Sequence, residues 1–99
     1  MAIINIIRNA NGVSADPPSV TIAKNEAVYF ANLDTHSAHQ PTQAGQAKDY
    51  WFDYTIPAAV EGQDAATSPA LNLPPTGAPV SFVIDAGSTA GGTIILQTA

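Results

Sequence analysis

The stretch that most constrains the fold runs over residues 19–39, SVTIAKNEAVYFANLDTHSAH. It begins with a short β-branched run at residues 20–22, followed by a turn signal that contains asparagine, which tolerates a positive φ. Residues 27–32 then alternate, with Val28 and Phe30 on one face, as in a strand half-buried against a core. The polar segment that follows holds both histidines of the chain. This stretch therefore predicts two strands joined by a tight turn, and then a loop.

Short apolar segments separated by turn signals make up most of the remaining chain. Further strands are expected at residues 2–8, 70–73, 79–85 and 93–98. The first has isoleucine on both faces (Ile3, Ile4, Ile6, Ile7), which is typical of a strand covered on both sides. Residues 13–19 contain two prolines and are expected at a sheet edge or in a connection. A helical turn around residues 58–61 is the only helical signal, so the sequence predicts one all-β domain over residues 1–99, a sandwich or barrel.

Residues 40–67 are the least regular part and are expected to form an insertion between strands. They contain an aromatic cluster, of which Tyr50, Trp51 and Tyr54 are candidates for a partner-binding surface, since aromatic side chains are enriched at interfaces. The alternative is structural: Trp51 closes one end of the core and the tyrosines lie over loops.

Composition excludes several classes of partner. Only 11% of the 99 residues are charged, and eight acids outnumber three scattered bases, for a net charge of −5. A nucleic-acid partner requires clustered lysine and arginine, and an anionic membrane surface attracts basic segments, so neither is expected. No apolar run approaches the roughly 18 residues that span a bilayer. The partner is expected to be a protein or a small molecule, and an oligomer is compatible with the neutral surface.

The compartment is inferred from the first residues. The chain starts directly on an apolar strand pattern, without a basic segment or the apolar core of a signal peptide. A periplasmic or secreted protein whose signal peptide has been removed is the preferred interpretation, and a cytoplasmic protein is the alternative.

The order of these motifs resembles that of a cupredoxin, the small Greek-key sandwich of the blue-copper proteins. In that family a V-T-I strand is followed by a turn, a strand ending in asparagine, often an aspartate, and a histidine that binds copper. Here these are residues 20–22, residues 28–30, Asn32, Asp34 and His39. The second half is also similar, in residues 68–73, 80–82, Gly87 and 92–96. The resemblance implies a cupredoxin-like Greek-key β-sandwich.

The same resemblance implies a metal site that the sequence does not complete. A blue-copper centre needs a cysteine thiolate, two imidazoles and a weak axial ligand, often methionine. In the family, the loop before the last strand supplies the thiolate, the second imidazole and the axial ligand. In this chain that loop, residues 87–92, has no Cys, His or Met; the chain has no cysteine at all, and its only methionine is Met1. The fold is therefore expected without blue-copper electron transfer.

Asp34, His36 and His39, in the segment D-T-H-S-A-H, are the remaining candidate metal ligands. Imidazole and carboxylate suit Cu(II), with Zn(II) and Ni(II) as alternatives, and the two histidines can converge in a loop although they could not in a strand. The other interpretation is that His39 is a relic of the family's ligand position and His36 is exposed to solvent.

The sequence therefore predicts a non-enzymatic cupredoxin-like binding module, with Cu(II) as its candidate cofactor. The alternative is a structural or assembly subunit without metal. An enzyme would need an open metal site and a general base, for which Asp34 is the candidate.

Overall fold

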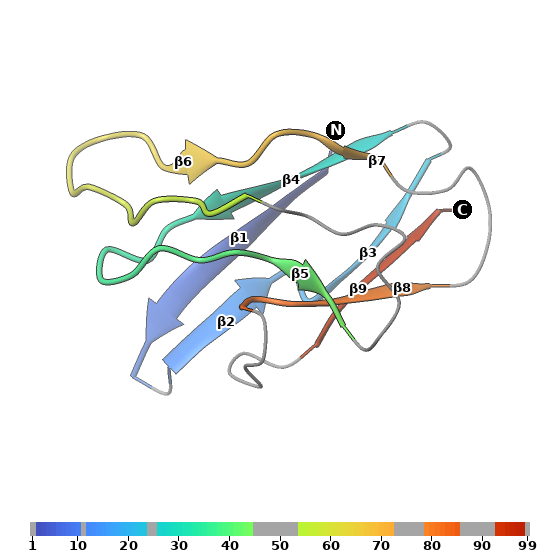
Figure 1. Ribbon diagram of the computed structural model, residues 1–99, viewed down its shortest axis with the longest axis horizontal. Helices are drawn as coiled ribbons and strands as arrows, with labels where there is room; N and C mark the ends of the chain where they lie inside the picture. Colours follow the sequence, from blue (N-terminus) through green and yellow to red (C-terminus); the bar gives the residue numbers. More distant parts are fainter. Residues whose placement is uncertain are drawn as a thin grey trace.

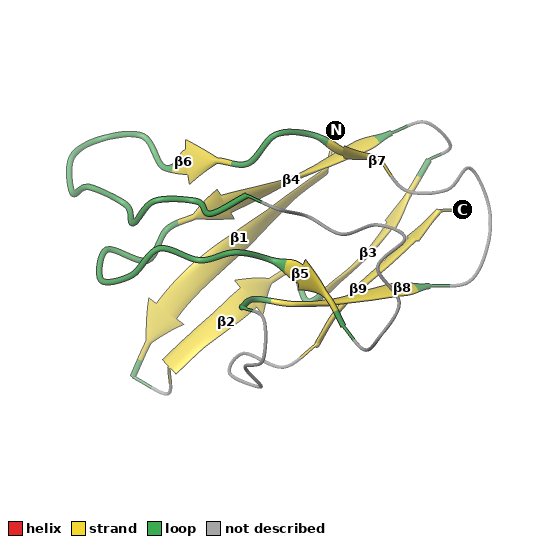
Figure 2. Ribbon diagram, in the orientation of Figure 1, coloured by secondary structure: helices red, strands yellow, loops and turns green. Residues whose placement is uncertain are grey.

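A computed structural model describes residues 2–10, 12–23, 26–44, 54–72, 79–85 and 93–98, and these contain strands and turns but no helix (Figure 2). None of them therefore forms a helix that could cross a membrane. The strands, in chain order, are β1 (Ala2–Asn9), β2 (Gly12–Asp16), β3 (Ser19–Ile22), β4 (Ala27–Asn32), β5 (Thr42–Gln43), β6 (Ala66–Thr67), β7 (Leu71–Asn72), β8 (Val80–Val83) and β9 (Thr93–Thr98). The expected all-β fold is confirmed.

The strands form two mixed sheets (Figure 1). The first has the order β2-β1-β4-β6, with β7 also paired to β4, and the second has the order β3-β9-β8-β5. Two pairs, β1 with β4 and β3 with β9, are parallel. The chain changes sheet between β2 and β3 and again between β3 and β4, as expected of a Greek-key sandwich.

The core lies between the two sheets, where the inward faces of the strands meet. β4 contributes Val28 and Phe30, β8 contributes Val80 and Phe82, and the rings of Phe30 and Phe82 are 6.1 Å apart, tilted by 53°. The inward positions expected from the alternation of residues 27–32 and 79–85 are therefore confirmed. Ile56, from the segment expected to be an irregular insertion, is also fully buried in this core.

Strand β1 does not match the expectation of a strand covered on both sides. Ile4 and Ile6 are fully buried, but Ile3 on the other face is 42% exposed and Ile7 is partly exposed. The reason is that the second sheet covers only the inner face of β1. The helical turn that the sequence allows around residues 58–61 does not form. The structure instead has a turn over residues 60–63, closed by a 3.0 Å hydrogen bond from the Gln63 amide to the Val60 carbonyl.

Candidate functional site

Asn32, the last residue of β4, fixes the loop that carries both histidines. Its Oδ1 accepts a 2.9 Å hydrogen bond from the amide of Asp34. Its Nδ2 lies 3.0 Å from the carbonyl oxygen of Ser37, and 3.2 and 3.1 Å from those of Ile56 and Pro57. Asn32 is fully buried, so these contacts satisfy a side chain that has no access to water. They join the end of β4 to the segment around Ile56.

Asp34 is a fully buried carboxylate bound by a fork of two arginine nitrogens. Nε and Nη2 of Arg8, on β1, donate to its two oxygens at 2.9 Å each. The His36 amide also donates to it, at 2.8 Å. The bond from Arg8, followed by that from His39, holds the pKa of Asp34 well below its usual range against the opposing effect of burial. Asp34 is therefore ionised at neutral pH.

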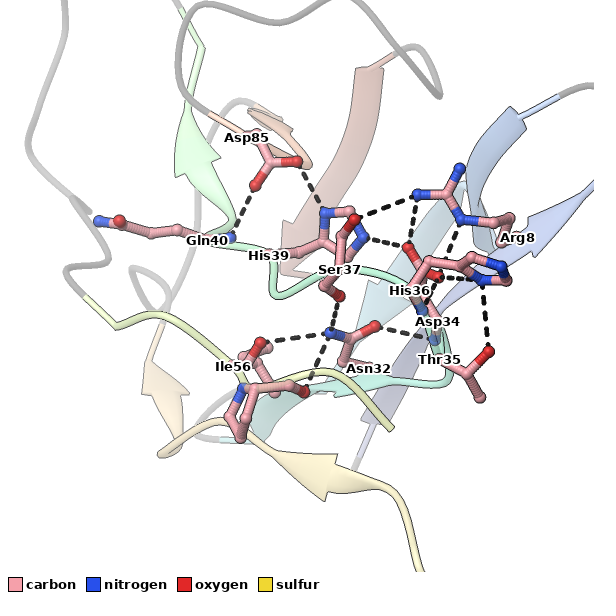
Figure 3. Close-up of polar contacts among 11 residues, drawn as sticks. Arg8, Asn32, Asp34, Thr35, His36, Ser37, His39, Gln40, Ile56 and Asp85 are labelled. Carbon is pink, nitrogen blue, oxygen red and sulfur yellow. Dashed lines mark hydrogen bonds and ion pairs between the residues drawn. The ribbon is translucent and has the colours of Figure 1, made fainter. Parts of the chain in front are cut away.

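His39 is buried and lies between two carboxylates, as Figure 3 shows. Its backbone forms a two-way bridge with Ile56, with N–O distances of 3.0 and 2.8 Å. Its Nε2 is 2.7 Å from Oδ2 of Asp34, and its Nδ1 is 2.7 Å from Oδ2 of Asp85, which follows β8. The other oxygen of Asp85 accepts a 2.9 Å bond from the Gln40 amide. The ring is thus held at both nitrogens.

The four charged side chains form a balanced group, here called the ion network: Arg8, Asp34, His39 and Asp85. Ionised carboxylates only accept hydrogen bonds, so the His39 ring can bond both carboxylates at once only when both of its nitrogens carry a proton. In that form two positive charges meet two negative charges at the end of the sandwich where β1 and β4 end. Arg8 comes from one sheet and Asp85 from the end of a strand in the other, so the ion network links the two sheets.

The fold of the chain is similar to that of solved structures. No family model matches the sequence, and no curated protein matches it. A mutant plastocyanin of a fern is similar over 99% of this chain and 100% of its own, with a TM-score of 0.69 and 15% identity. The oxidised form of plastocyanin from Dryopteris crassirhizoma covers the same shares, with a TM-score of 0.66 and 16% identity.

The fold is that of a cupredoxin. The expected cupredoxin-like fold is therefore confirmed, and the similarity extends over 99% of the chain. At these identities the similarity concerns the fold, and the site has to be judged on its own residues.

The residues of this cupredoxin fold do not fit a blue-copper centre. The chain has no cysteine to supply the thiolate. Each ring nitrogen of His39 already faces a carboxylate oxygen at 2.7 Å, so neither has a lone pair to offer a metal while the ion network is intact. Residues 87–92, which the resemblance aligns with the ligand loop, lie outside the described residues.

The structure brings the three candidate metal ligands together around Asp34. His39 lies against its Oδ2, while Nδ1 of His36 is 3.6 Å from Oδ1 and 3.3 Å from the Thr35 hydroxyl. The His36 side chain is 73% exposed and that of Asp34 is fully buried. Within the described ranges, no three His, Cys, Asp or Glu side chains form a group that could hold a metal ion.

Of the three residues of the candidate partner surface, Tyr54 lies within the described part of the chain. Tyr54 is 39% exposed, consistent with a contact residue. Tyr50 and Trp51 lie outside the described residues.

Two members of the ion network, Arg8 and Asp85, were not identified from the sequence. For Arg8 a signal exists: period-2 alternation places it on the inner face of β1 with Ile4 and Ile6, and a charge on an apolar face requires a buried partner. For Asp85 there is no such signal, because the alternation of β8, continued past its last residue Val83, places Asp85 on the outer face. This pattern does not indicate the contact of Asp85 with His39.

Proposed function

We propose that this protein is a non-enzymatic binding module with a cupredoxin fold and no blue-copper electron-transfer site. The observation that carries the proposal is that both ring nitrogens of His39 lie 2.7 Å from carboxylate oxygens. In this proposal the ion network takes the structural place of a metal centre, because the carboxylate contacts at both ring nitrogens of His39 fix the loop between β4 and β5 without a metal.

The proposed binding surface lies beside the ion network, where two loops meet. The Ala59 amide donates to the Asp34 carbonyl at 2.8 Å and joins the loops. Leu33 and Val60, each next to one of these two residues, are 44% and 56% exposed. Exposed aliphatic side chains at one end of a rigid sandwich are suited to a partner with a complementary apolar surface. Tyr54, from the same segment as Val60, is the aromatic candidate for this contact.

Weak binding of Cu(II), or of another divalent metal, by Asp34, His36 and His39 stays a prediction from the sequence. Imidazole suits copper, and His36 is exposed enough to meet an ion from solvent. His39 could join only by losing one of its two carboxylate contacts, so a site that uses both histidines would have to break the ion network. We therefore expect any bound Cu(II) to depend on His36 and to be weak.

Calorimetric titration of Cu(II) into the wild type and the variants His36→Ala and His39→Ala tests this proposal. We expect weak binding that the His36 variant reduces and the His39 variant does not, together with a lower melting temperature for the His39 variant only. Micromolar or tighter binding that disappears in the His39 variant would contradict the proposal, as would an intense blue absorption of the copper-loaded wild type. His36→Ala is the matched control for folding, because its side chain is exposed.

A periplasmic or secreted location remains part of this proposal. It is supported by the low share of charged residues, a composition common among exported proteins. The alternative function, a subunit of an assembly, is supported by the edge of strand β2 with which no described strand pairs.

A further inference from the structure

Strand β2 is an outer edge of its sheet among the described strands, and its own residues give it little of the usual protection against pairing. Figure 1 shows it beside β1, and no described strand pairs with its far side. It has five residues, whereas the edge strand β3 has four and the edge strands β5, β6 and β7 have two each. Natural edges are blocked by lysine, proline, bulges or short length, but β2 reads Gly-Val-Ser-Ala-Asp, with a single charge at its end.

The hydrogen-bond pattern of the β1–β2 hairpin shows which groups are offered on this edge. Asn9 and Gly12 pair across a two-residue loop, so they exchange both backbone bonds. Such pairs alternate along an antiparallel ladder, and the next ones are Ile7 with Ser14 and Asn5 with Asp16. The amide and carbonyl groups of the two residues in between, Val13 and Ala15, therefore point away from β1.

We propose that β2 pairs with β2 of a second copy of this chain, antiparallel, about a two-fold axis at Ser14. In this register Val13 lies opposite the partner's Ala15, and Ala15 lies opposite the partner's Val13. All the outward backbone groups of these residues then form hydrogen bonds, four across the interface, and the two sheets join into one continuous sheet. Pairing of a strand with its own copy in antiparallel register is symmetric and closes at two subunits.

The side chains of β2 suit this register. Val13 and Ala15 are only partly buried and pack against the core, so the partner's Ala15 and Val13 would cover what they leave exposed. Asp16, the only charge of the strand, falls opposite the partner's Gly12, so the two carboxylates are at opposite ends of the interface. Ser14 faces the partner's Ser14, and two small side chains allow the close approach of a non-hydrogen-bonded pair.

The charge of the molecule favours a second copy over an acidic or basic partner. The chain carries a net charge of −5, so two copies repel unless they meet where few charges lie. From Gly12 to Ala15 the edge has no charged side chain, which is what two acidic molecules need and what a charged partner could not use. The proposal is independent of the binding surface at the ion network.

Disulfide trapping tests the register, and the absence of native cysteines makes the result direct. Cα atoms of a non-hydrogen-bonded pair are about 4.5 Å apart, within the range that a disulfide spans. With a mild added oxidant, we expect Ser14→Cys to form a covalent dimer at least about tenfold faster than Thr21→Cys, an exposed position on β3, an edge strand of the second sheet. Equal rates for the two variants would overturn the proposed register.

Sedimentation velocity over a range of concentrations tests the dimer without a crosslink. We expect a reversible dimer of the wild type, and a dissociation constant raised by about fivefold or more in Ser14→Glu, because like charges then face each other. Thr21→Glu, with the same charge change on β3, should dimerise as the wild type does. A wild type that stays monomeric at the highest concentration would refute the proposal. Circular dichroism of each variant separates loss of pairing from loss of folding, and the crosslinking result stands if Ser14→Glu does not fold.

Discussion

The apolar core and the ion network both hold the two sheets together, and they do so by different physics. In the core, Phe30 of one sheet meets Phe82 of the other, and the gain comes from apolar area removed from water. In the ion network, the partly exposed Arg8 and Asp85 meet through Asp34 and His39, two buried polar groups whose removal from water is costly.

This difference determines how each region responds to change. When an apolar core side chain is shortened, the protein loses stability in proportion to the apolar surface removed, and this loss does not depend on pH. A buried charge network adds little net stability, but deleting one member leaves another charge buried without a partner. The ion network thus fixes the geometry of the loop after β4, while the core supplies most of the stability.

The largest effect is expected from the core. Replacement Phe82→Ala should lower the free energy of unfolding by about 4 kcal/mol, because the side chain is fully buried and leaves a cavity next to Phe30. Urea unfolding at pH 7 and at pH 4 should give the same loss. The conservative change Phe82→Leu should cost about 1 kcal/mol. A loss for Phe82→Ala that changed strongly with pH would show that core and network are coupled.

The core was predictable from the sequence for a reason that does not extend to the network. The alternation in β4 and β8 places every second side chain inward. The inward and outward faces of each strand differ in composition, so Val28, Phe30 and Phe82 could be assigned to the core. Such a pattern is local. Ile56 escaped it because its segment has no regular alternation, and it is held in place by the bridge to His39.

The network depends on contacts that no local pattern encodes. Arg8 and Asp34 are 26 residues apart, and His39 and Asp85 are 46 apart. The sequence singled out Asp34, His36 and His39 as candidate metal ligands, from their residue types, their spacing and the family resemblance. It gave no indication that Arg8 and Asp85 contact Asp34 and His39. Only the packing of the two sheets shows that an arginine and a second aspartate reach the same point.

The second largest effect is expected from Asp34. Its replacement Asp34→Asn keeps the size of the side chain but removes the charge that Arg8 and His39 share, and should cost about 3 kcal/mol in the free energy of unfolding. The matched control Asp64→Asn, at an exposed position, should stay within about 0.5 kcal/mol of the wild type. Urea unfolding measures both. Equal losses in the two variants would mean that the ion network is dispensable.

A pH series distinguishes the two regions further. The pKa of Asp34 is lower in the folded protein than the value of about 3.9 expected in the unfolded chain. Its contribution is therefore fully present above the unfolded value and is lost as the pH falls toward the folded one. The melting temperature of the wild type should fall between about pH 5 and pH 3, and the gap between wild type and Asp34→Asn should narrow over the same range. Phe82→Ala should keep its full gap, and a constant gap for the Asp34 variant would contradict the assignment.

The smallest effect is expected from the second carboxylate on His39. The Asp85 side chain is 40% exposed, so water can replace part of what Asp85→Asn removes, and the amide oxygen can still accept the bond from the Gln40 amide. We expect a loss of about 1 kcal/mol, against no measurable change for the exposed control Glu61→Gln. Because Asp34 and Asp85 contact the same ring, the double variant should deviate from the sum of the two single losses. Strictly additive losses would mean that His39 does not couple the two carboxylates. A loss for Asp85→Asn as large as that for Asp34→Asn would mean that the burial of a carboxylate does not determine how much its replacement costs.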